Sequence, residues 1–229
     1  MRESRRTMAR RPSDSPPPSR QRVARERAPG PDFTRETLWY ATQDGRIAGV
    51  DEAGRGPLAG PVVAAAVILD PHHVPAGLND SKKLGAHERE RLFGEILDRA
   101  EVGIGTASAA EIDRLNIRQA TFLAMRRALL SLPQAPAHAL VDGRDIPHAC
   151  PVPASALIGG DALCVSIAAA SIIAKVTRDR IMTQLCAADP RYGFRQHMGY
   201  PTPAHLGALR EHGPCPHHRM SFGPVRALI

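Results

Sequence analysis

The sequence has 229 residues, 43% of them hydrophobic and 23% charged, which fits one compact domain with a short additional segment. Its longest uninterrupted apolar run, residues 62–69, is far shorter than the roughly 20 residues of a membrane-spanning helix, which excludes a helical membrane protein. The Arg-rich N-terminus also lacks the apolar stretch of a secretory leader, and we expect a cytoplasmic protein.

The net charge of +7 is concentrated at the N-terminus. Residues 1–30 hold nine arginines against three acids, so the rest of the chain carries a net charge of only +1. A segment rich in Pro, Ser and Arg cannot bury enough apolar surface to offset the entropy lost on ordering. We therefore expect residues 1–43 to be a disordered basic tail and residues 44–229 to be the folded domain.

Hydrophobic periodicity predicts strands and helices after the tail. The β-branched run at 62–69 lies between Pro61 and Pro71, which is typical of a buried strand. In chain order we expect strands at 46–51 and 62–69, a helix at 87–100, a strand at 102–106, a helix at 109–130, strands at 139–141 and 156–158, and a long helix from about 163 to 185. Strands interleaved with helices predict an α/β fold around one sheet.

Four acidic residues stand where apolar stretches give way to glycine or a turn. Asp51 and Glu52 end the first strand, Asp142 follows the strand at 139–141, and Asp161 follows two glycines. Carboxylates beside a core need a compensating partner, and two Mg²⁺ ions held by such a cluster can drive phosphodiester hydrolysis. A surface turn would explain any one acid, and a helix N-cap would explain Asp161. The four together favour a metal site.

Adjacent residues on a regular strand point to opposite faces of the sheet, so Asp51 and Glu52 cannot both reach one site from a flat strand. The glycines that follow, Gly54 and Gly56, permit a bulge there. Alternatively, one of the two acids acts through its backbone carbonyl, or supports the site without contacting the metal directly.

Two glycines flank an arginine in Gly54-Arg55-Gly56. This stretch lacks the Lys-Ser/Thr ending of a P-loop and leads into a strand, which disfavours nucleotide binding. It does allow backbone N–H groups and a guanidinium to approach a sugar-phosphate backbone closely. A tight turn with an exposed arginine is an equally good interpretation of these residues alone.

Longer motifs connect these features. They read GVDEAGRGPLAGPVV at 49–63, NDSKKL at 79–84, VDG at 141–143, GD at 160–161, SIAAASIIAKVTRD at 166–179, YGF at 192–194 and GYPT at 199–202. In this order they resemble ribonuclease HII, the type 2 ribonuclease H, from about residue 47 to residue 226. Met198 departs from the family pattern, which commonly has a lysine before the Gly-Tyr pair, so the resemblance does not imply an auxiliary phosphate contact at this position.

The resemblance implies a ribonuclease H-like fold with a mixed central sheet flanked by helices and a small C-terminal helical segment. It maps the metal-binding acids onto Asp51, Glu52, Asp142 and Asp161, with Mg²⁺ or Mn²⁺ as cofactor and two ions during catalysis. It also implies that Gly54, Arg55 and Gly56 read the ribose 2′-hydroxyl, and that Tyr200 stacks on the neighbouring deoxyribose, with Tyr192 as second choice. Lys82, Lys83 and Lys175 suit backbone phosphates, and solvated or snorkelling lysines are the alternative.

The expected function is hydrolysis of the RNA strand of RNA/DNA hybrids and cleavage at single ribonucleotides in duplex DNA, leaving 5′-phosphate and 3′-hydroxyl ends. We expect a monomer without membrane contact. A junction resolvase on the same fold would use similar acids but would ignore the 2′-hydroxyl, which Gly54-Arg55-Gly56 argues against. A non-catalytic hybrid-binding protein would be expected to lack at least one of the acids, and all four are present.

Overall fold

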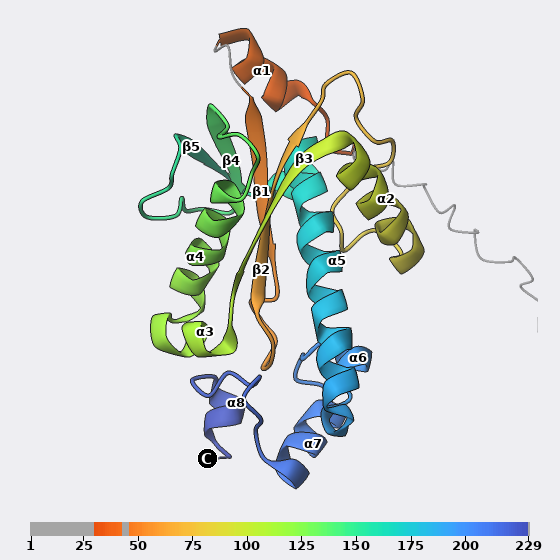
Figure 1. Ribbon diagram of the computed structural model, residues 1–229, viewed down its shortest axis with the longest axis vertical. Coiled ribbons are helices and arrows are strands. Elements are labelled where there is room, and N and C mark those ends of the chain that lie inside the picture. Colours follow the sequence, from red (N-terminus) through yellow and green to blue (C-terminus); the bar gives the residue numbers. More distant parts are fainter. Residues whose placement is uncertain (1–29, 43–45, 229) are drawn as a thin grey trace, which may run out of the picture.

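The computed structural model describes residues 30–42 and 46–228 and centres on a five-stranded sheet (Figure 1). The strands are β1 (Ile47–Ala53), β2 (Val62–Leu69), β3 (Ala100–Ala107), β4 (His138–Asp142) and β5 (Ala154–Leu157). The helices are α1 (Thr34–Thr42), α2 (Ala86–Arg99), α3 (Ala109–Leu115), α4 (Ile117–Leu130), α5 (Val165–Ala188), α6 (Phe194–His197), α7 (Pro203–His212) and α8 (Gly223–Arg226), with 3₁₀ turns η1 (Gly160–Ala162) and η2 (Pro190–Tyr192).

The sheet is mixed, as predicted, with strand order β3-β2-β1-β4-β5. β1 pairs antiparallel with β2 and parallel with β4, while β2–β3 is antiparallel and β4–β5 is parallel. Every residue of β2 is buried, because helices cover both faces of the sheet. The predicted α/β fold is therefore confirmed.

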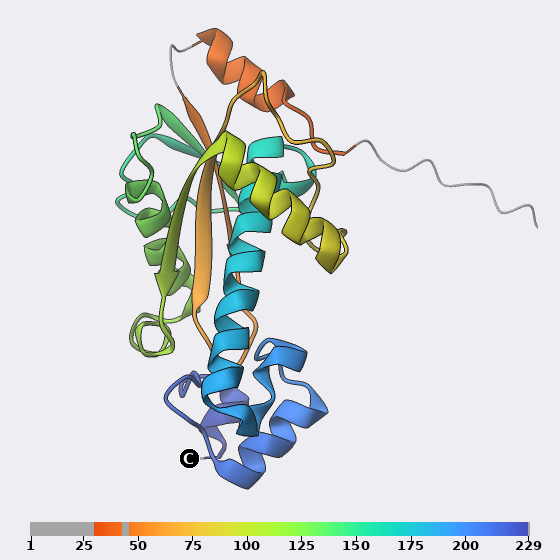
Figure 2. The ribbon, with the colours of Figure 1, turned by 45° about the vertical axis from the view of Figure 1, so that its right-hand side comes forward.

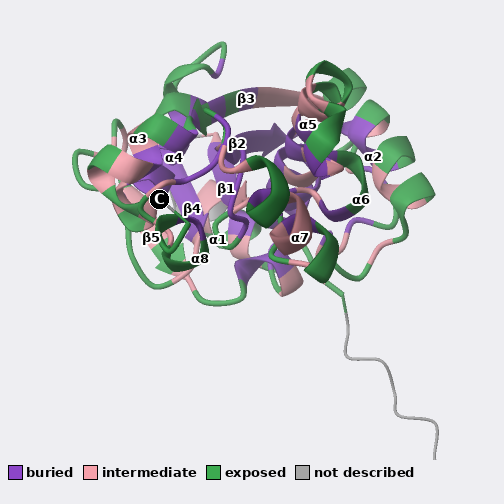
Figure 3. Ribbon diagram, turned by 90° about the horizontal axis from the view of Figure 1, so that it is seen from below, coloured by how far each residue is buried: buried purple, intermediate pink, exposed green. Residues whose placement is uncertain are grey.

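Helix α4 covers one face of the sheet and helix α5 covers the other (Figures 1 and 2). On β1, Val50 packs in the cluster with α4, whereas Ala53 packs with α5. A Cβ atom on Gly49 would lie 2.1 Å from the backbone carbon of Ser166, so only glycine lets α5 lie this close to β1. Seen from below, buried residues gather on the strands and on the inner faces of these helices (Figure 3).

The predicted helix at 109–130 is two helices in the structure. Asn116 separates them with φ of 66° and ψ of 162°, a strained backbone conformation outside the helical region that residues other than glycine rarely adopt. Its side chain also accepts a 3.1 Å hydrogen bond from the backbone N–H of Gln119 and so caps α4. The apolar pattern gave no sign of this break, because both helices bury residues in the same core cluster, such as Ile112 and Phe122.

The predicted tail through residue 43 is corrected for residues 30–42. Helix α1 packs on the domain, and its buried Glu36 accepts hydrogen bonds from the N–H and the hydroxyl of Ser166, at 2.8 and 2.7 Å. The expectation for residues 1–29 lies outside the described residues. No helix in the described part of the chain has the length and hydropathy required to cross a bilayer.

A small helical segment from α6 to α8 follows the end of α5, as expected (Figure 1). Three backbone hydrogen bonds tie it to the loop between β1 and β2: Leu58 N–H to Gly199 O, Gly60 N–H to His217 O, and Arg219 N–H to Leu58 O, each 2.8 Å long. This segment therefore fixes the loop that follows the acidic end of β1.

Candidate active site

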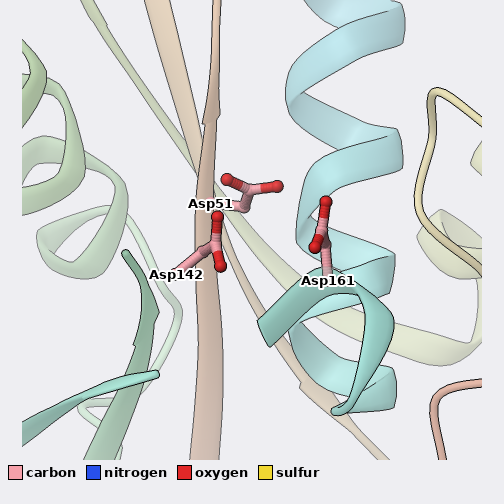
Figure 4. Close-up of side chains that lie close together, drawn as sticks. All are labelled: Asp51, Asp142 and Asp161. Carbon is pink, nitrogen blue, oxygen red and sulfur yellow. The ribbon is translucent and has the colours of Figure 1, made fainter. Parts of the chain in front are cut away.

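Three aspartates from separate parts of the chain converge at one end of β1 and β4 (Figure 4). Asp51 is on β1 and Asp142 ends β4, and the parallel pairing of Val50 with Val141 places the two side by side. Asp161 lies in η1, the turn that precedes α5. One carboxylate oxygen from each lies within 4.8 Å of the others.

Burial makes this cluster electrostatically costly. Asp51 is 5% exposed, and its pKa is raised well above the usual value, first by burial and then by the neighbouring carboxylates of Glu52 and Asp142. Burial also raises the pKa of Asp142, although the N–H of Gly160 opposes this effect. Lys82 lies nearby, with its Nζ 3.5 Å from Asp161 Oδ2, but its side chain is largely exposed. Two buried carboxylates and one half-buried carboxylate, with this much repulsion, fit a hard divalent cation.

Asp161 does not cap the long helix. The N-cap residue of α5 is Cys164, and Asp161 points its carboxylate toward Asp51 and Asp142 instead (Figure 4). The N-cap alternative for Asp161 is therefore wrong.

A pocket of about 280 Å³ opens beside the aspartates. Its lining residues are Asp51, Glu52, Ala53, Gly54, Arg55, Gly56, Ser81, Lys82, Asp142, Lys175, Arg178 and Tyr200. The pocket thus brings together the expected substrate contacts, with one exception. Lys83 is exposed and does not line it. The Nζ of Lys175 donates a 2.7 Å hydrogen bond to Asp179 Oδ1, which holds this lysine at the pocket wall.

The glycines at the pocket mouth have different constraints. Gly54 has φ of +95°, and a Cβ atom there would lie 2.0 Å from Arg178 Nε. A Cβ atom on Gly56 would meet only Tyr200, at an ordinary 3.6 Å from Cε1. The ring of Tyr200 is 46% exposed and is available for stacking. Tyr192 is 2% exposed and belongs to the core, so it offers no stacking surface.

Comparison with known proteins agrees with this site. The family model described as Ribonuclease HII matches residues 48–225. The chain belongs to the ribonuclease HII family. Ribonuclease HII of Parvibaculum lavamentivorans is 60% identical over 183 residues, covering 80% of this chain and 68% of the relative. That of Magnetococcus marinus is 55% identical over 205 residues, covering 88% of this chain and 96% of the relative.

A solved structure gives the same result. The crystal structure of ribonuclease H2 from Pyrococcus horikoshii superposes with a TM-score of 0.66 at 28% identity, covering 80% of this chain and 96% of that one. The resemblance found in the motifs is therefore confirmed. This ribonuclease HII family member is a metal-dependent ribonuclease H, an endonuclease for the RNA of RNA/DNA hybrids.

Glu52 lines the same pocket of this ribonuclease HII site but is not one of the three clustered aspartates. β1 pairs with β2 without interruption from Gly49 to Ala53, so the bulge that the following glycines would permit is absent between these residues. Asp51 consequently faces α5, while Glu52 lines a small hollow on the α4 side and accepts a 3.2 Å hydrogen bond from Arg55 Nη1. Asp51 is the one of the two that places its carboxylate in the cluster.

Sequence reasoning missed three residues of the ribonuclease HII pocket and its loop. Ser81 and Arg178 lie inside recognised motifs, but nothing in their spacing indicates a role. Arg219 holds the β1–β2 loop from the far end of the chain, and no sequence signal marks it. Arg178 had one available clue, a charged residue within a helix whose first half is almost entirely apolar.

Proposed function

We propose that this chain hydrolyses the RNA strand of RNA/DNA hybrids and also cleaves at single ribonucleotides embedded in duplex DNA, leaving 5′-phosphate and 3′-hydroxyl ends. The observation that carries the proposal is a single pocket lined by Asp51 and Asp142 of the aspartate cluster, by the Gly54–Gly56 turn and by Tyr200. Phosphodiester hydrolysis requires the first feature, and recognition of ribose requires the other two.

The proposed cofactor is Mg²⁺ or Mn²⁺, with two ions during catalysis. Asp51, Asp142 and Asp161 are the proposed direct ligands, and Glu52 approaches from the opposite face of β1. Ions bound there would supply an activated water and stabilise the leaving oxygen. Lys82 and Lys175 stand at the pocket wall, where their ammonium groups can contact the phosphates on either side of the scissile bond.

Ribose recognition is assigned to the Gly54–Gly56 turn and Tyr200. A 2′-hydroxyl both donates and accepts hydrogen bonds, and backbone groups of a fixed turn can pair with it. The exposed ring of Tyr200 faces Gly56 and can stack on the next deoxyribose. All of these groups come from one chain, which supports action as a monomer.

The decisive experiment compares three duplexes that differ at one position: a single ribonucleotide, the matched deoxynucleotide, and a 2′-O-methyl nucleotide. We expect the full-length protein to cut only the duplex with the ribonucleotide, and only when Mg²⁺ or Mn²⁺ is present. The cut should leave a 5′-phosphate and a 3′-hydroxyl end. Equal cutting of the all-deoxy duplex would favour a resolvase-like nuclease. Tight binding of hybrids without cleavage in either metal would favour a hybrid-binding protein.

A further inference from the structure

Two arginines are buried behind the loop that joins β1 to β2. Arg178 comes from α5 and is 1% exposed, and Arg219 comes from the C-terminal segment and is 0% exposed. Buried guanidinium groups are rare because the charge loses its hydration, and most are paired with carboxylates. In the described part of the chain, neither of these arginines forms an ion pair.

Backbone carbonyls replace the missing carboxylates. Arg219 donates from Nη1 to Arg55 O at 2.9 Å, from Nη2 to Gly54 O at 2.6 Å, and from Nη2 and Nε to Gly60 O at 2.9 and 3.1 Å. Arg178 donates to the carbonyls of Ala59, Pro61 and Met198, each at 3.0 Å. The two side chains therefore hold both ends of the loop from 54 to 61.

The cost of this arrangement is visible in the ionisation of Arg219. Burial, followed by the nearby charge of Arg178, lowers the pKa of Arg219 to about 9. Apolar side chains could hold a loop in place without the desolvation free energy that buried charges require. Two buried guanidinium groups that donate to backbone carbonyls and to no carboxylate indicate that the orientation of the carbonyl groups itself matters.

Carbonyl orientation decides where the amide groups of the turn point. In a planar trans peptide the N–H points away from the C=O of the same peptide unit. Because Gly54 O and Arg55 O are turned toward Arg219, the N–H groups of Arg55 and Gly56 are turned away from it. Within the described ranges these two N–H groups have no acceptor, and both residues line the pocket.

We propose that Arg219, supported by Arg178, is a positioning residue that fixes the Gly54–Gly56 turn so that the N–H groups of Arg55 and Gly56 stand ready for the ribose 2′-oxygen. The inference rests on the proposed reading of ribose by this turn. A turn with two glycines would otherwise sample many conformations, and donors that must first be ordered discriminate poorly. Planar guanidinium forks can orient several carbonyls at once, which a lysine cannot do.

The test uses the full chain with Arg219→Met, Arg219→Lys and Arg178→Lys. The matched control is Arg210→Met, which removes an exposed arginine of α7. Two affinities are measured by fluorescence anisotropy without divalent metal, one for a single-ribonucleotide duplex and one for the matched all-deoxy duplex. Their ratio is the readout, because partial unfolding lowers both affinities together and leaves the ratio unchanged. Mn²⁺ binding to the aspartates is measured separately by calorimetry.

We expect Arg219→Met to reduce the ribose preference by about tenfold, the effect of losing one well-placed hydrogen bond. Arg219→Lys should restore part of it, Arg210→Met should match the wild type, and Mn²⁺ affinity should be unchanged throughout. If Arg219→Met does not fold, the affinity ratios of Arg219→Lys and Arg178→Lys provide the test, and a ratio below that of the wild type is expected for both. A wild-type ratio in the folded Arg219 variants overturns the inference. A ratio of one in the wild-type protein overturns the proposed function first, and the inference with it.

Discussion

The Oδ1 atom of Asp142 accepts a 2.7 Å hydrogen bond from the backbone N–H of Gly160. This bond joins the end of β4 to the turn that carries Asp161, so two of the three clustered acids are held in one unit. The N–H favours the charged form of Asp142 and opposes the rise in its pKa that burial causes. The same contact thus shapes the site and prepares it for a cation.

Replacing Asp142 with Asn should remove cleavage while leaving the fold intact. The amide oxygen can still accept the bond from Gly160, but it lacks the charge needed to bind a metal. We expect single-turnover cleavage to fall by at least about 1,000-fold, a barrier increase of roughly 4 kcal/mol. Circular dichroism should be unchanged. The control is Asp145→Asn, which affects only an exposed ion pair with Arg118 at 3.0 Å. Similar activity of the two variants would show that Asp142 is structural.

Asp51→Asn should stabilise the metal-free protein at neutral pH. Because the folded-state pKa of Asp51 is raised, its stabilising contribution is complete below the unfolded pKa of about 3.9 and is lost as pH rises through the folded value. At pH 7 with EDTA, we expect the Tm of the variant to exceed that of the wild type by about 2 to 4 °C, corresponding to about 1 kcal/mol.

The difference between Asp51→Asn and wild type should shrink as pH falls toward about 4. Adding Mg²⁺ at pH 7 should raise the Tm of the wild type more than that of the variant, because binding to the folded state stabilises it. Scanning calorimetry at several pH values, with and without Mg²⁺, checks both statements. A variant that is less stable than wild type at pH 7 in EDTA would contradict them.

Glu36→Ala should lower stability without changing the chemistry. Glu36 accepts bonds from the N–H and hydroxyl of Ser166 and from the thiol of Cys164, and the N-cap side chain of α5 provides no capping bond. A cap supplied by another helix should be worth about 1 to 2 kcal/mol, and urea unfolding measures it. The kcat in saturating Mg²⁺ should stay within about twofold, since Glu36 is not among the pocket residues. A chain beginning at Gly30 keeps this cap and should unfold like the full chain.

The sheet and its covering helices were predictable because their signals are local. Buried runs such as residues 62–69 and the apolar first half of α5 have periods that identify them in isolation. The break at Asn116 and the helix at 34–42 were not. The first depends on the positive φ of a single residue, Asn116, and the second on docking against the distant Ser166.

For the site, the sequence indicated acids at or near the ends of core strands, as at Asp51 and Asp142. It could not decide between Asp51 and Glu52, because the answer depends on whether the strand bulges. It also gave no sign of Arg219, whose partners lie more than 150 residues away in the chain. Contacts over such separations leave no local pattern to detect.

Gly56 and Tyr200 offer the sharpest test of ribose recognition. A Cβ on Gly56 meets only the Tyr200 ring at 3.6 Å, so Gly56→Ala should fold normally and obstruct only the substrate. Displacing the ribose by about 1 Å costs roughly 100-fold, and we expect kcat/KM on the single-ribonucleotide duplex to fall by about that factor. Gly54→Ala is unsuitable because its Cβ would displace Arg178. Gly85→Ala, which meets nothing within 4 Å, is the matched control.

Tyr200→Ala removes the stacking surface and should lower kcat/KM by about 10- to 100-fold, since losing one aromatic stacking contact with nucleic acid costs on the order of 1 to 3 kcal/mol. The loss should be greater for a single ribonucleotide than for a long RNA/DNA hybrid, because only the former presents a deoxyribose beside the cleaved ribose. Wild-type activity of Gly56→Ala, the preceding variant, would mean that the ribose never approaches the turn. For Tyr200→Ala, steady-state kinetics on both substrates measures the difference, with Tyr200→Phe as the variant that keeps the ring. Equal losses on the two substrates would mean that Tyr200 does not contact the deoxyribose at the junction.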